Sequence, residues 1–229
     1  MGSQRDSLAG VRIGMVVLPT DPWPETLATV QRLDRLGYDH VWLYDHLTWR
    51  QYRDRAWHAT YPLLAGLAVG TRRIRLGTMV ANLNVRHPVT LAKDAMTIDH
   101  LSGGRMVLGV GAAGLGFDAT VLGQAPLTPR QRVDRLEEAL ELLDRLLLDD
   151  APDRQPVDHG GDWYTVEGAR NLPGCVQRPR IPLAVAAGGH RSIDVAARMG
   201  DAWITYGDAI GTDGHQDTMR VVADEIDRL

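Results

Sequence analysis

The sequence predicts an α/β fold in which βα units follow one another around a parallel sheet. Short runs of β-branched and apolar residues alternate with longer segments whose apolar residues recur at helical spacing. Proline or an N-cap residue opens several of the helical segments, and glycine closes others. Counting these pairs along the 229 residues gives six βα units.

The first three units occupy the N-terminal half of the chain. Their first helix is expected to start at Pro24, to carry an apolar stripe from Leu27 to Leu36 and to stop at Gly37. The second helix is expected to end at Gly70, and the third at the Ser-Gly-Gly break that begins at Ser102. The expected strands are Arg12 to Val17, His40 to Tyr44 and Ile74 to Val80, and the later helices are Tyr61 to Val69 and Pro88 to Ser102.

A long amphipathic helix dominates the second half. Thr128 serves as its N-cap and Pro129 lies in its first turn, while leucines form its apolar stripe. Residues 151–180 are polar and are expected to form an insertion with one short strand, Trp163 to Val166, whose length makes it a candidate lid. The remaining expected elements are strands Met106 to Val110, Pro182 to Ala186 and Ala202 to Tyr206, a helix from near His190 and a last helix from about Gln216.

The number of units bears on how the sheet closes. A TIM-type barrel needs eight strands and typically about 250 residues. The pattern therefore predicts a single TIM-barrel-like (β/α)8 domain over residues 1–229, truncated after about six units, with the last two absent. A complete, open, doubly wound sheet is the alternative.

Composition excludes several functional classes. The hydrophobic content of 44% is that of an ordinary globular protein. The formal net charge is −4, so the surface has no basic excess to bind nucleic acid or an anionic membrane. The single cysteine, Cys175, rules out an intrachain disulfide, and neither a signal segment nor a long apolar run is found. We expect a cytoplasmic protein that acts on small molecules.

In βα barrels the reactive groups lie where strands end. The second strand leads into Asp45, His46 and Trp49, a carboxylate, an imidazole and an indole within one turn. An imidazole exchanges protons near neutral pH, and the adjacent carboxylate could fix its tautomer. The alternative is an ordinary solvated loop.

Two further strand ends are candidate anion sites. Arg86 and His87 precede the third helix, where free N–H groups favour an anion, although both side chains could equally cap the helix or form ion pairs. The turn from Ala186 to Gly189 runs into a helix near Arg191 and suits a phosphate, unless its glycines serve turn geometry alone.

Other site types are not supported. The glycine-rich run that begins at Gly109 matches a dinucleotide fingerprint only superficially, because no helix follows at once. The histidines and Cys175 do not have metal-ligand spacing, and neither a nucleophile elbow nor a phosphate-binding P-loop is found.

Seven stretches in this order resemble the luciferase-like family of flavin-dependent monooxygenases and deazaflavin-dependent reductases. Each stretch alone is weak, but together they span nearly the whole chain. They are Gly37 to Asp39, Val41 to His46, Arg75 to Thr78 with Arg86 to Pro88, Asp99 to Arg105 with Leu108 to Gly111, Arg132 to Glu138, Val176 to Pro179, and Ala197 to Trp203.

The resemblance implies a TIM-like barrel that binds FMN or coenzyme F420 at its C-terminal mouth, and an oxidoreductase that transfers hydride or activates O₂. It implies a cis peptide bond at Met79-Val80 beneath the ring, a proton donor or acceptor at His46, and frequent dimerisation. The Glu that deazaflavin-dependent members often carry after strand four is replaced here by Ala113-Gly114.

The resemblance and the strand ends together define the candidate residues. Lys93 is the only lysine, so nearly all basic residues are arginines, a bias typical of GC-rich genomes. On that ground we favour F420 over FMN as the cofactor. A non-catalytic flavin-binding or assembly protein is the alternative function, and exposed sheet edges predict a homo-oligomer. His46 and Trp49 are the candidate catalytic residues, and the candidate cofactor-binding residues are Asp45, Thr78, Met79, Val80, Gly109, Gly111, Ala112, Ala186, Ala187, Gly188, Gly189, His190 and Arg191.

Overall fold

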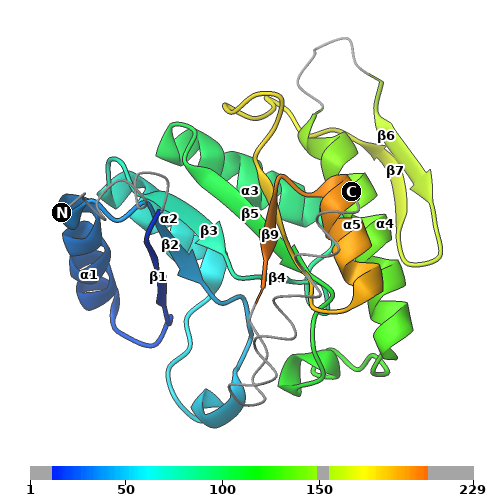
Figure 1. Ribbon diagram of the computed structural model, residues 1–229, viewed down its shortest axis with the longest axis horizontal. Coiled ribbons are helices and arrows are strands. Elements are labelled where there is room, and N and C mark those ends of the chain that lie inside the picture. Colours follow the sequence, from blue (N-terminus) through cyan, green and yellow to red (C-terminus); the bar gives the residue numbers. More distant parts are fainter. Residues whose placement is uncertain (1–11, 149–154, 206–229) are drawn as a thin grey trace, which may run out of the picture.

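The computed structural model describes residues 12–148 and 155–205, and these form an α/β fold with a curled parallel sheet (Figure 1). The sheet has seven strands in the order β1-β2-β3-β5-β8-β9, with β4 paired to β5. Every pairing within it is parallel. The strands are β1 (Gly14–Val17), β2 (His40–Leu43), β3 (Arg75–Thr78), β4 (Ala81–Asn82), β5 (Met106–Gly111), β8 (Leu183–Ala186) and β9 (Ala202–Ile204).

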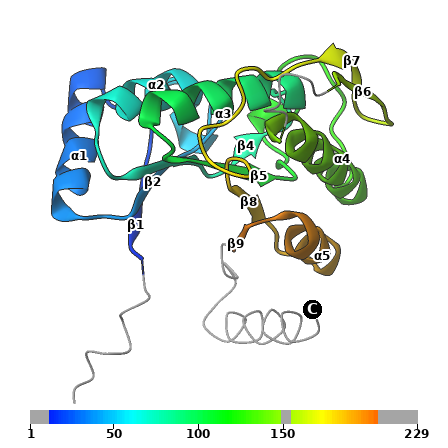
Figure 2. The same ribbon diagram turned by 90° about the horizontal axis from the view of Figure 1, so that it is seen from above.

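Helices follow the convex side of the sheet, as in part of a barrel wall (Figure 2). This arrangement confirms the expected (β/α)8-type architecture over five consecutive βα units and the strand of the sixth. The predicted helix ends lie within a residue or two of those found, because proline, glycine and Thr128 signalled them. The helices are α1 (Trp23–Leu36), α2 (Thr60–Gly70), α3 (Pro88–Ser102), α4 (Pro129–Leu147) and α5 (His190–Met199), with short 3₁₀ turns η2 (Arg50–Tyr52) and η3 (Phe117–Ala119).

Two strand predictions for the main sheet need correction. The strand expected from Ile74 to Val80 is split into β3 and β4, and the peptide bond between Met79 and Val80, at the break, is cis. The strand expected from Ala202 to Tyr206 ends at Ile204, because Thr205 is not part of it, and Tyr206 lies outside the described residues. The last predicted helix, from about Gln216, lies outside the described residues.

Helix α4 shows how local sequence sets an element. The side chain of Thr128 accepts a hydrogen bond from the backbone N–H of Gln131, and the Gln131 side chain accepts one from the backbone of Thr128, a complete capping box. Its leucine stripe is buried against the sheet, with Leu136, Leu140 and Leu143 fully covered. The N-terminal cap and the stripe together hold the helix against β5, between α3 and α5.

Buried carboxylates tie loops together at the N-terminal end of the strands. Asp34, near the end of α1, accepts hydrogen bonds from the backbone N–H groups of residues 72, 73 and 74. These bonds lower the pKa of Asp34, although burial alone would raise it. Asp99 of α3 likewise accepts from the backbone of Val176 and Gln177, just before β8.

The insertion differs from its prediction. Instead of one strand over Trp163 to Val166, the structure has an antiparallel pair, β6 (Val157–Gly160) and β7 (Thr165–Ala169). Trp163 and Tyr164 lie in the turn, because the carboxylate of Glu138 accepts hydrogen bonds from both of their N–H groups. The pair lies alongside α4, and its role as a lid stays a prediction (Figure 1).

Close contact between β3 and β5 gives the first test. A Cβ atom added at Gly109 would lie 1.9 Å from the carbonyl oxygen of Thr78, a backbone atom that cannot rotate away. We expect Gly109→Ala to lower the free energy of unfolding by about 1–3 kcal/mol, the usual cost of overpacking. Gly114→Ala is the matched control, because a Cβ there meets nothing within 4 Å. Urea denaturation of both variants makes the comparison, and equal stability would contradict the close approach.

Candidate active site

Loops from four strand ends meet at one end of the sheet. The segments that contain η2 and η3 lie together below the strands in Figure 1. They are joined by hydrogen bonds from the loop after β2 to Asp118, which lies in η3 after β5. The C-terminal mouth anticipated from the sequence is therefore where the predicted site residues gather.

His46 is paired with a carboxylate that sequence reasoning did not identify. Its Nδ1 lies 2.7 Å from Oδ2 of Asp118, and Asp118 is only 4% exposed. The amide of Asn82 also donates to that oxygen, at 2.8 Å. The expectation that Asp45 would fix the His46 tautomer is wrong, because Asp45 has another partner.

Asp45 belongs to a buried ion pair beneath the loop. Its two oxygens accept hydrogen bonds from Nη2 and Nε of Arg86, at 2.8 and 3.1 Å, and the backbone N–H of Asn82 donates to it as well. The Arg86 guanidinium lies over the ring of Tyr61. Burial alone would lower the pKa of Arg86, but the hydrogen bonds from Arg86 to Asp45 raise it. Burial raises the pKa of Tyr61 well above its ordinary value.

The structure decides between the two interpretations of Arg86 and His87. Arg86 forms an ion pair, and the His87 side chain accepts a hydrogen bond from the backbone of Val89 as the N-cap of α3. Both residues thus have structural partners. An anion site at this helix is therefore not supported. Asp45, the partner of Arg86, lies in the layer below the mouth.

Aromatic side chains line the loop after β2. Trp49 stacks on His46 with ring centroids 6.1 Å apart and on Tyr52 at the same distance. Trp57 contacts both Trp49 and His46. Together with Tyr44, these rings form a continuous wall beside the imidazole. The sequence singled out only Trp49, although the aromatic spacing of residues 44–57 was a usable signal.

Beside this wall lies a floor of small residues from β3 and β5. The hydroxyl of Thr78 donates to the carbonyl of Gly109 at 2.8 Å. A Cβ at Gly111 would come within 2.7 Å of Val80. The cis bond at Met79-Val80, implied by the family resemblance, is confirmed. Ala112 is partly exposed at the strand end.

The turn after β8 joins Ala186 to α5. Neither Gly188 nor Gly189 has a positive φ, and a Cβ at Gly188 would meet nothing within 4 Å. Turn geometry therefore does not account for these glycines. An open groove of about 620 Å³ lies between this turn, His190 and the start of α4.

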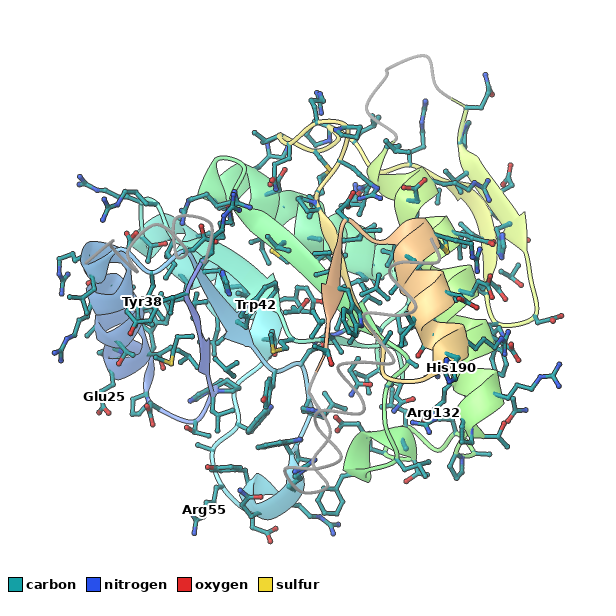
Figure 3. All side chains as sticks on the ribbon, in the orientation of Figure 1. Glu25, Tyr38, Trp42, Arg55, Arg132 and His190 are labelled. Atoms are coloured by element: carbon teal, nitrogen blue, oxygen red, sulfur yellow. The ribbon has the colours of Figure 1, made fainter. Side chains whose placement is uncertain are left out.

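The sequence predicted that Arg191 would supply positive charge at this turn, but Arg191 is paired with acidic residues. Its guanidinium forms ion pairs with Asp134 and Glu137 of α4. Two other arginines of α4, Arg132 and Arg135, were not selected as candidates from the sequence. Figure 3 labels Arg132 on α4 and His190 at the start of α5, and residues of both helices line the groove beside the turn.

Arg132 and Arg135 carry positive charge, and neither has an acidic partner in the part of the chain that the structure describes. Nη1 of Arg132 donates to the carbonyl of Ala113 at 2.7 Å, and Nη2 of Arg135 donates to Oδ1 of Asn84 at 2.7 Å. The Nε atoms of both are buried without a hydrogen-bond partner. Burial lowers the pKa of Arg135 and raises the pKa of nearby Tyr164 to about 12. Within residues 12–148 and 155–205, neither arginine has a salt bridge.

Two searches of the described residues gave no site. They contain no group of three or more His, Cys, Asp or Glu side chains placed to hold a metal ion. None of the helices in that part of the chain is both long enough and apolar enough to cross a membrane.

Comparison with known proteins identifies the family of this chain. The sequence profile described as luciferase-like monooxygenase matches residues 5–228. The chain belongs to this family. Its resemblance at the motifs from Gly37 to Trp203 is thereby confirmed, and the open doubly wound sheet is excluded in favour of the barrel wall.

The curated relatives of this luciferase-like chain include a monooxygenase and an F420-dependent dehydrogenase. The 4-hydroxyprotoasukamycin monooxygenase of Streptomyces nodosus subsp. asukaensis is 36% identical over 168 residues, covering 70% of this chain and 41% of that enzyme. The F420-dependent glucose-6-phosphate dehydrogenase of Amycolatopsis mediterranei is 32% identical over 179 residues, covering 76% and 50%. The chain thus spans about half the length, or less, of these curated relatives.

Among solved structures, monooxygenase RslO1 from Streptomyces bottropensis superposes with a TM-score of 0.75 at 25% identity. The match covers 94% of this luciferase-like chain and 65% of RslO1. The curled parallel sheet is therefore the luciferase-like barrel fold. The family contains both monooxygenases and F420-dependent enzymes, so membership does not determine the cofactor.

The buried ion pair beneath the luciferase-like mouth gives the second test. Arg86→Met leaves the Asp45 carboxylate, 1% exposed, without its counter-charge. We expect a loss of about 3–5 kcal/mol in unfolding free energy, as for other broken buried pairs. The double variant Asp45→Asn/Arg86→Met removes the isolated charge and should be more stable than Arg86→Met alone.

The control for this test is Arg55→Met, which removes an exposed arginine from the loop after β2. It should change stability by less than about 0.5 kcal/mol. Guanidinium denaturation compares the four proteins. An Arg86→Met variant as stable as the control would show that the pair contributes nothing to folding.

Proposed function

We propose that this chain provides the active-site half of a flavin- or deazaflavin-dependent oxidoreductase for a small organic substrate. The observation that carries the proposal is His46, held by Asp118 at the mouth between the aromatic wall and the β3–β5 floor. His46 exchanges the proton that accompanies hydride transfer or O₂ activation, and Trp49 packs against the substrate beside it.

The residues of the mouth fit such a cofactor. Thr78, Gly109 and Gly111 keep the floor flat, so that backbone rather than side chains would face a planar ring. The open turn at Gly188 supplies backbone N–H groups at a helix start, where phosphate binds well. A bound flavin or deazaflavin supplies the hydride, and FMN in addition permits O₂ chemistry.

Positive charge beside the turn supports an anionic cofactor end. Arg132 bonds to Ala113, two residues past Gly111, and Gly111 pairs with Ala186 in the sheet. The half-buried Arg132 thus lies near the proposed phosphate turn, and no carboxylate among the described residues pairs with it. An anion there would supply the missing counter-charge.

We favour coenzyme F420 over FMN, in line with the arginine-rich composition and with relatives named as F420-dependent. The relative named as a monooxygenase keeps FMN as the other candidate. A non-catalytic flavin-binding protein stays the alternative function, and the cytoplasmic location stays a prediction.

Titration with F420 and with FMN, followed by cofactor fluorescence, tests this function. We expect one of them to bind, with Gly188→Val weakening it at least about tenfold because the side chain fills the phosphate's place. Gly160→Val, at another glycine whose Cβ meets nothing within 4 Å, is the control. No binding of either cofactor would refute the proposal, and binding without reduction of any acceptor would favour the non-catalytic alternative.

We also propose that the chain forms a homo-oligomer, most simply a dimer. Strands β1 and β9 each pair on one side only within the described residues, and Met15 of β1 is 40% exposed. Such edges pair readily with another chain, and burying their apolar side chains contributes about 25 cal/mol per Å². Light scattering at micromolar concentration should give twice the 25.2 kDa chain mass. A monodisperse monomer would exclude the dimer.

A further inference from the structure

One polar contact reaches the His46 ring. Among the described residues its only hydrogen-bond partner is Asp118, through Nδ1. The opposite nitrogen, Nε2, has no partner there, and 32% of the side chain is exposed. The imidazole is therefore held on one side and open on the other.

Apart from His46, every described group that contacts the Asp118 carboxylate donates a hydrogen bond to it. The Asn82 amide donates to Oδ2 at 2.8 Å, and His46 Nδ1 lies 2.7 Å from the same oxygen. The backbone N–H groups of Leu47 and Thr48 approach Oδ1. An ionised carboxylate only accepts hydrogen bonds, so the proton between the two side chains belongs to Nδ1.

We propose that Asp118 is a positioning residue that holds neutral His46 in the Nδ1–H tautomer and turns the Nε2 lone pair toward the mouth. In this state His46 accepts a proton from the substrate and does not donate one. After it has taken a proton, the imidazolium stays paired with the same carboxylate. The catalytic meaning rests on the proposed function, but the tautomer does not.

Asp118→Asn tests the tautomer with little change of shape. Leu47 N and Thr48 N are fixed donors and keep the new amide oxygen at the Oδ1 position. The amide nitrogen then takes the place of Oδ2 and donates to His46 Nδ1, and His46 adapts by moving its proton to Nε2. Adding Asn82→Asp gives the amide nitrogen a second acceptor and restores the net charge.

Nitrogen NMR of histidine-labelled protein reads the tautomer directly. His46→Gln identifies the signals of that ring among the eight histidines. We expect Nδ1–H in the wild-type chain, Nε2–H in Asp118→Asn and in the double variant, and Nδ1–H in Asp54→Asn. Asp54 is an exposed acid of the same loop, so it controls for the charge change.

A wild-type ring that carries its proton on Nε2 would overturn the proposal, and this measurement requires no change at Asp118. An unchanged tautomer in both the Asp118→Asn and double variants would overturn it as well.

Turnover separates this inference from the proposed function. With cofactor and substrate, Asp118→Asn should lower kcat at least about 100-fold, as loss of an orienting carboxylate does in catalytic triads, with KM changed far less. If the tautomer inverts while kcat stays the same, Asp118 still controls the ring, and the proton role of His46 is wrong.

Discussion

The structure depends on carboxylates that accept hydrogen bonds from distant backbone N–H groups. Parallel strands are joined by crossovers, so their loops cannot pair with each other as hairpin turns do. Asp34 holds the segment before β3, Asp99 the segment before β8, and Asp118 the loop after β2. Glu138 does the same for the turn between β6 and β7. Each carboxylate accepts hydrogen bonds from two or more backbone N–H groups at once, which few neutral side chains can do.

This arrangement also explains why the site is organised in layers. The lower layer is the Asp45–Arg86 pair, which supports Asn82, and Asn82 in turn donates to Asp118. Asp118 then bonds to His46 at the mouth. Three consecutive strand ends are thereby linked through polar contacts, so the position of the imidazole depends on residues that lie well below it.

The sequence predicted local features well and distant contacts poorly. Strands and helices followed from periodicity and caps, and the family motifs led to the cis bond at Met79-Val80 and to His46. The partner of His46 was assigned to adjacent Asp45, but Asp118 lies 72 positions away, and no local pattern specifies such a contact. Arg132 was quoted only within a helical motif, since its orientation toward Ala113 depends on how α4 packs.

The aromatic wall and the floor differ in how many parts of the chain they need. One segment, residues 44–57, carries every ring of the wall, whereas the floor requires β3 and β5 together. Evolution can therefore lengthen, shorten or replace that single loop while the floor keeps its shape. A family built in this way can diversify its substrates by exchanging one segment and retain a common chemistry.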